Sequence, residues 1–207
     1  NYMALVKYNN NSISGITSAA SVSSGAMTHI KTLTASSSST LSFVDGSSDV
    51  VLDNTYPIYL FKFINIHPSE QEHLYFNLSA DTGSNYNVSK TSTVFQSYHA
   101  ENDSGAALSY QTGNDLANGT GDQKIANNIG IDSDESFCGE MLLFNPSSTT
   151  FVKHFIIRAP YNEASGIVEY YVAGYANTTS AVDAIIFRMN SGNIDSGTIK
   201  LYGIKDS

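Results

Sequence analysis

Three neighbouring residues, Asp81-Thr82-Gly83, match the catalytic tripeptide of aspartic proteases. That chemistry needs two carboxylates that share one proton. A single chain would therefore carry a second copy of the motif, or a homodimer would supply it. Here the tripeptide precedes Ser84-Asn85 in a polar stretch and lacks the apolar flanks of an active-site loop. Because Asp and Gly are ordinary turn residues, the pattern predicts a turn.

Acidic residues are concentrated in the segment that contains Asp132, Asp134 and Glu135. Carboxylate oxygens at such close spacing are ligands that Ca²⁺ prefers. The spacing matches only a fragment of an EF-hand loop and lacks the distal glutamate. The default interpretation is an acidic loop exposed to solvent, and a calcium site stays open beside it. The sequence predicts no other metal site and no cofactor.

The five histidines do not form the spaced pair on one face of an element that a zinc site requires. We therefore predict polar or surface roles for them rather than catalysis. Serines are numerous, but none occupies the Gly-x-Ser-x-Gly turn of a hydrolase. The histidines are His29, His67, His73, His99 and His154.

A carbohydrate-active enzyme would need two carboxylates on either side of a groove. Glu135, Glu140 and Glu169 are available, but nothing in the sequence pairs them. The enzyme remains a remote alternative, and we predict that the chain has no catalytic residues. The one cysteine, Cys138, is predicted to point into the core, as free cysteines usually do.

The composition limits the classes of partner. The 207 residues carry 10 Lys and Arg against 19 Asp and Glu, a net charge of −9. This balance argues against binding to nucleic acid and to anionic membranes. We see neither a signal peptide nor an apolar stretch long enough to span a bilayer. One cysteine excludes an internal disulfide framework, which is consistent with assembly in a reducing cytoplasm.

Only 14% of the residues are charged, and the Ser, Thr, Asn and Gly that replace them suit turns and strand surfaces rather than exposed helices. Apolar residues alternate with polar ones in short runs bounded by turns, which is typical of a β-sandwich or barrel. We therefore predict an all-β fold, an antiparallel jelly-roll-like sandwich, with roughly nine or ten strands. The predicted strands lie near residues 41–43, 50–52, 58–66, 74–78, 94–98, 137–144, 151–158, 167–175, 184–189 and 198–204, and His67-Pro68 is predicted to end the third of them.

Two segments depart from this rhythm. Residues 1–26 are small, polar and turn-rich, so we divide the chain into an N-terminal arm at 1–26 and a sandwich domain at 27–207. Residues 100–135 are rich in Asn, Asp, Gly and Ser, and we predict a long functional loop there, with room for a short helical turn at 104–116.

The run at residues 58–66 is largely apolar at both odd and even positions, whereas one sandwich interior covers only one face of a strand. One set therefore has to lie under a neighbouring subunit or a covering loop. The two sets are Tyr59, Phe61 and Phe63, and Ile58, Leu60, Ile64 and Ile66.

Several segments resemble recurring segments in structural proteins of marine bacteriophages. The final segment resembles the C-terminal strand pair of phage proteins labelled tail fibre, head fibre or capsid decoration. The resemblance implies a jelly-roll-like sandwich, trimers, and no catalytic residues. The segments are residues 52–59, 64–68, 81–88, 144–151, 176–184 and 191–204.

Together these features predict a non-enzymatic protein on the surface of a virion, made in the host bacterial cytoplasm. The leading hypothesis is a homotrimeric capsid decoration protein that the arm at 1–26 anchors to the major capsid protein or another virion component. The alternative is a receptor-binding tail protein or short fibre tip that contacts a host-surface glycan through residues 100–135. The absence of a stalk or repeat region favours the first hypothesis.

Overall fold

The computed structural model describes residues 26–163 and 166–205. These residues form twelve β-strands and no helix, so no helix among them could cross a membrane. The all-β prediction is confirmed. The strands are β1 (Met27–Thr34), β2 (Leu41–Val44), β3 (Ile58–Pro68), β4 (Glu72–Ser79), β5 (Lys90–Ala100), β6 (Ala106–Tyr110), β7 (Gln123–Ile129), β8 (Phe137–Phe144), β9 (Lys153–Glu163), β10 (Gly166–Ala176), β11 (Ala184–Met189) and β12 (Ile194–Ile204).

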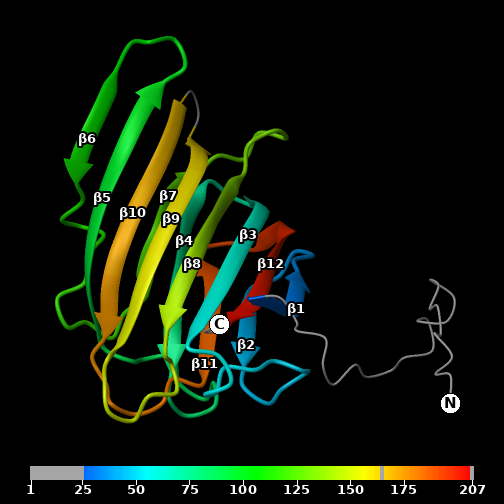
Figure 1. The fold of residues 1–207 in the computed structure, drawn as a ribbon. Helices are drawn as coiled ribbons and strands as arrows, with labels where there is room; N and C mark the ends of the chain where they lie inside the picture. The colour runs from blue at the N-terminus through cyan, green and yellow to red at the C-terminus, as the bar shows by residue number, and fades with distance from the viewer. Residues whose placement is uncertain (1–25, 164–165, 206–207) are drawn as a thin grey trace, which may run out of the picture.

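Two antiparallel sheets form a sandwich (Figure 1). The large sheet has eight strands in the order β1-β12-β3-β8-β9-β10-β5-β6, and the small sheet has four in the order β2-β11-β4-β7. Figure 1 looks onto the outer face of the large sheet, with β6 at the left and the small sheet behind. The sandwich is therefore confirmed, whereas the jelly-roll connectivity and the prediction for the arm, whose residues 1–25 lie outside the described residues, stay predictions.

The core lies between the sheets and is built from alternate residues of each strand. On β3, Tyr59, Phe61 and Phe63 all point into it and are fully or almost fully buried. Phe187 on β11 meets Phe63 edge-on with ring centroids 5.1 Å apart, and Phe61 at 5.6 Å. Edge-to-face pairs of this kind add stabilisation beyond the apolar area that they bury.

A bulge in β3 changes which of its residues face the core, so the predicted sets of residues on its two faces are partly wrong. The register shifts between Phe63 and Ile66, and Asn65 adopts a positive φ of 51°. One inserted residue reverses the alternation of all that follow. Ile66 therefore turns into the core, with no exposed surface, instead of sharing the outer face with Ile64.

The structure also corrects the prediction for Cys138, which lies opposite this bulge. Cys138 does not point into the core: it is half-buried, and its Sγ lies 3.3 Å from the backbone N–H of Asn65, which donates to it. Its neighbour Phe137 takes the core position. The prediction that His67-Pro68 ends the strand is confirmed, because Pro68 is the last residue of β3.

The predicted long loop at residues 100–135 is wrong, because β6 and β7 lie within it. β6 pairs with β5 at the edge of the large sheet, where four of its five residues are exposed. The predicted helical turn at 104–116 is therefore replaced by an edge strand. β7 pairs with β4, and its register breaks twice, which removes the period of two from its sequence.

Candidate interaction surface on the large sheet

The tripeptide at Asp81 forms the predicted turn. The Asp81 carboxylate accepts hydrogen bonds from the Ser79 hydroxyl at 2.6 Å and from the backbone N–H of Asn85 at 2.8 Å. These bonds lower the pKa of Asp81 to about 2, with the Ser79 bond the largest cause. Thr82 and Gly83 take the positive φ values of the turn. The carboxylate thus holds a loop together.

The acidic segment does not form a metal site in the part of the chain that the structure describes. A carboxylate oxygen of Glu135 accepts the backbone N–H of Asp132 at 2.9 Å, which closes the turn. No group of three His, Cys, Asp or Glu side chains among the described residues could hold a metal ion. The geometry favours the acidic loop over the calcium site that the sequence left open.

The histidines lie apart on different elements. Nδ1 of His73 accepts the backbone N–H of Asn128 at 3.0 Å, and burial is the main reason why the pKa of His73 is lowered. His99, near the tip of the β5–β6 hairpin, lies 3.5 Å from the Asp103 carboxylate. Such isolated positions agree with the polar and surface roles predicted from the sequence.

Of the three candidate glutamates, two line one hollow of about 400 Å³ on the outer face of the large sheet. Arg158 lies beside Glu140 in the register of β8 and β9, and its Nη2 donates to Glu169 at 2.6 Å. Glu169 also accepts the Tyr171 hydroxyl at 2.7 Å. Glu135 belongs to the distant turn described above.

Next to this hollow, the outer face carries what we call the apolar band. Its members come from β12, β3, β8, β9 and β10, and the strand register places them in two adjacent cross-strand rows. Ile156 is 47% exposed, whereas Leu60, between Tyr202 and Leu142, is only 6% exposed. The band consists of Tyr202, Leu60, Leu142, Ile156 and Ala173 in one row and Ile204, Ile58, Phe144 and Tyr175 in the other, where His154 of β9 lies between Phe144 and Tyr175.

A shallow hollow of about 680 Å³ opens in the part of the band over β8, β9 and β10 and extends to β5. Phe144, Ile156 and Tyr175 supply its apolar walls, and Thr91 and Thr93 supply its β5 side. The hollow lacks acidic and permanently charged side chains; His154 is its one titratable lining group apart from Tyr175. This composition suits contact with an apolar surface better than chemistry.

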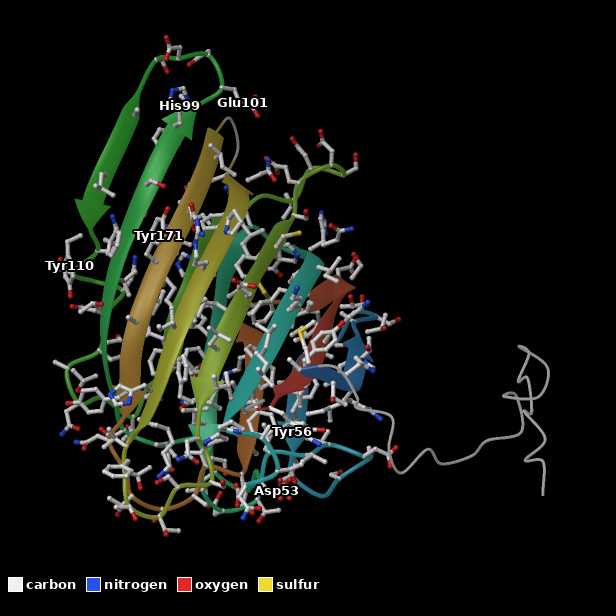
Figure 2. The ribbon with its side chains drawn as sticks, viewed as in Figure 1. Asp53, Tyr56, His99, Glu101, Tyr110 and Tyr171 are labelled. Atoms are coloured by element: carbon white, nitrogen blue, oxygen red, sulfur yellow. The ribbon has the colours of Figure 1, made fainter. Side chains whose placement is uncertain are left out.

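The next cross-strand row is what we call the aromatic row. Register pairing places its side chains opposite one another on four consecutive strands, β9, β10, β5 and β6. Figure 2 shows Tyr171 over β10 and Tyr110 at the outer edge of the molecule. Sequence reasoning missed this row, because only the strand register brings its members together. The row consists of Arg158, Tyr171, Phe95 and Tyr110.

The aromatic row is ordered by direct contacts. Phe95 and Tyr171 stack with ring centroids 4.9 Å apart and an interplanar angle of 8°. The Arg158 guanidinium lies 5.4 Å from the centroid of Tyr171, and its bonds to Glu169 raise the pKa of Arg158. At the other end, the Tyr110 hydroxyl donates to a carboxylate oxygen of Asp115 at 2.6 Å, which raises the pKa of Tyr110.

Comparison of the chain with protein-family models, with curated proteins and with solved structures finds no match.

Proposed function

We propose that the chain is a non-enzymatic structural subunit on the surface of a phage particle, and that copies of it assemble through the apolar band. The band is the observation that carries this proposal. It crosses consecutive strands, and side chains such as Ile156 are left half-exposed. A contiguous apolar patch of this kind marks an interaction surface more often than it marks idle surface.

The charge of the chain is compatible with a second copy as the occupant of the band. The chain has a net charge of −9, so two copies repel each other over most of their surfaces. The band contains no Asp or Glu, and two copies can approach there with the least repulsion. Burial of side chains that are already partly covered, such as Leu142 and Phe144, adds to the association free energy.

The strand order supports a jelly roll as the finer description of the fold. Two hairpins, β5–β6 and β9–β10, extend the large sheet beyond β8. Without them, the sheets read β1-β12-β3-β8 and β2-β11-β4-β7, the eight strands of a sandwich with two Greek keys. Jelly rolls are common in viral capsid proteins, which agrees with the resemblance noted in the sequence and with the trimer that it implies.

The geometry of the titratable groups supports a role without catalysis. The Asp81 and Glu135 carboxylates close turns, and Glu169 is bound by Arg158 and Tyr171. Each of these carboxylates holds a turn or an ion pair in place, which is a structural role.

Light scattering on the purified full chain at micromolar concentration tests the assembly. We expect an oligomer, with a trimer as the proposed stoichiometry. Ile156→Glu should yield a folded monomer, because it places a carboxylate in the middle of the band. Ser42→Glu, on the outer face of the small sheet, is the matched control and should leave the oligomer intact. A wild-type chain that stays monomeric would overturn assembly through the band.

Imaging of particles labelled with an antibody against this chain tests the location. Label over the shell would support a capsid decoration, and deletion of residues 1–26 should then abolish incorporation into particles while the sandwich still folds. Absence of label from every part of the particle would contradict the proposal.

A receptor-binding tail protein is the second candidate function. The β5–β6 hairpin, which projects beyond the rest of the sandwich in Figure 1, favours it, and its tip at residues 101–104 is exposed. If this candidate is right, label lies on the tail, and shortening of the tip reduces adsorption to the host while particles still assemble.

A further inference from the structure

We propose that the aromatic row binds a neutral polysaccharide, whose hexose rings stack on Phe95 and whose hydroxyl groups bond to Arg158 and Asp115. The site does not rest on self-association, because it extends to β5 and β6 at the edge of the large sheet, beyond the apolar band. The two proposals can therefore fail separately.

The row has the shape of a track for a linear polymer. Its four side chains stand on four consecutive strands, so the track runs perpendicular to the strands. Neighbouring strands lie about 4.8 Å apart, and three such steps give a track of about 14 Å. A track of this length accommodates a few consecutive sugar rings.

Phe95 is the less covered of the two stacked rings in this row. Tyr171 is covered on both sides, by Arg158 from β9 and by Phe95 from β5. Phe95 makes its one ring-to-ring contact among the described residues with Tyr171, and it is 39% exposed. Its other side faces the position of Tyr110, which is itself half-exposed and tethered to Asp115.

A hexose ring has the complementary chemistry. Its two flat sides present C–H groups, which pack on the electron-rich face of an aromatic ring. Its rim carries hydroxyl groups, which donate to carboxylates and accept from guanidinium N–H groups. The row places a carboxylate beyond one end of the stack, at Asp115, and the Arg158–Glu169 pair at the other.

The polar groups are held in place before any ligand arrives. Arg158 donates to one oxygen of Glu169 through Nε at 2.9 Å and Nη2 at 2.6 Å, while Tyr171 donates to the other oxygen at 2.7 Å. The Arg158 side chain is nevertheless 58% exposed, which leaves N–H groups available to a ligand. Fixed side chains lose less conformational entropy on binding.

Charge selects a neutral saccharide over an acidic one. The Glu169 carboxylate cancels the charge of Arg158, Asp115 adds a further negative charge, and the whole chain carries −9. A polymer of uronic acids would therefore be repelled, whereas a neutral hexose polymer would not.

Affinity electrophoresis of the full chain tests the site. Native gels would contain a galactomannan, dextran or a soluble β-glucan, with alginate as the acidic comparison. We expect at least one neutral polymer to retard the protein and alginate to have no effect. Since loss of a stacking ring commonly weakens binding by about tenfold or more, Phe95→Ala should remove most of the retardation.

Controls separate the site from the fold and from self-association. Ile167→Ala, at a more exposed apolar position on β10, should retain full retardation. Phe95→Leu keeps apolar bulk but removes the ring, and it should lose retardation with an unfolding midpoint near that of the wild type. Failure of all three neutral polymers to retard the wild type, or equal retardation of the wild type and Phe95→Leu, would overturn the proposal. So would loss of the oligomer in Phe95→Leu without any effect of polysaccharide, since the row would then contact a second copy.

Discussion

On the outer side of the small sheet, charged side chains are joined to one another, whereas on the outer face of the large sheet apolar side chains stand open. Arg188 on β11 donates to both oxygens of Asp122, at 2.8 and 3.0 Å, and Asn77 on β4 donates to the same carboxylate at 2.9 Å. These hydrogen bonds pair the charged groups of Arg188 and Asp122 within one chain. The outer face of the large sheet instead exposes apolar side chains that have no partner of this kind among the described residues. This difference is why we place the proposed interactions on the large sheet.

The largest effect that the comparison predicts is a loss of stability when Asn77 is replaced. Its amide links Lys90, Thr120 and Asp122 by hydrogen bonds. In Asn77→Ala the buried Lys90 ammonium and the partly buried Asp122 carboxylate lose these bonds together, and we expect the free energy of unfolding to fall by about 3 kcal/mol. Urea denaturation measures the change. Asn87→Ala, at an exposed position, is the control and should stay within about 0.5 kcal/mol of the wild type. Equal effects of the two variants would mean that the network does not stabilise the small-sheet side.

The second prediction concerns the pH dependence of the same network. Lys90 is fully buried, donates to Asn77 and to the Val88 carbonyl, and has its pKa lowered to about 8, chiefly by burial. Between this value and the unfolded pKa near 10.5, the unfolded state binds more protons, so stability increases as pH rises. From pH 7.5 to 9.5 the gain should be about 2 kcal/mol.

Denaturation midpoints over this pH range measure the effect, with Lys90→Met as the comparison. The variant should show a much smaller increase, and the remainder arises from Lys124 and Lys153, whose pKa values burial also lowers. If the free energy of unfolding of the wild type stays constant or falls between pH 7.5 and 9.5, the pKa of Lys90 is not lowered in the folded chain.

Strands with a period of two, such as β9, could be predicted from the sequence, and so could the apolar run of β11. β8 and β11 begin and end where the pattern placed them. The strands that were missed lack that period for a physical reason. β1 is an edge strand with a bulge between His29 and Lys31, and β6 is an edge strand that buries almost nothing. Edge strands need few apolar residues, so a prediction from composition assigns them to loops.

The candidate surface was less predictable than the fold. Tyrosines on strands could be counted, but their partners depend on which strands are neighbours. Phe95 and Tyr171 are far apart in sequence and stack because β5 pairs with β10 rather than with β4, which precedes it in the chain. The apolar character of both faces of β3 was visible, whereas the bulge that moves Ile66 to the core was not.

The third prediction tests whether the aromatic row is coupled within one chain. A double-mutant cycle with Phe95→Ala and Tyr171→Ala isolates the stacking energy of the pair. We expect a coupling of about 0.5–1 kcal/mol, as for other cross-strand aromatic pairs. Urea denaturation of the four proteins provides it. Zero coupling would mean that the rings are not held together in solution, which would weaken the case for a preformed site.

The smallest effect on a single chain is expected at the centre of the apolar band. Ile156 is 47% exposed, so Ile156→Ser removes little buried surface and should change the unfolding free energy of the isolated chain by less than about 0.5 kcal/mol. A partner that binds only the folded chain raises the apparent stability with concentration. The thermal midpoint of the wild type should therefore rise with protein concentration, while that of Ile156→Ser should rise less. Leu108→Ser is the control: Leu108 is more exposed, at 73%, but lies on β6 outside the band, and its variant should keep the wild-type concentration dependence. If the thermal midpoint of the wild type does not change with concentration, neither outer face mediates self-association. That result would contradict assembly through the band.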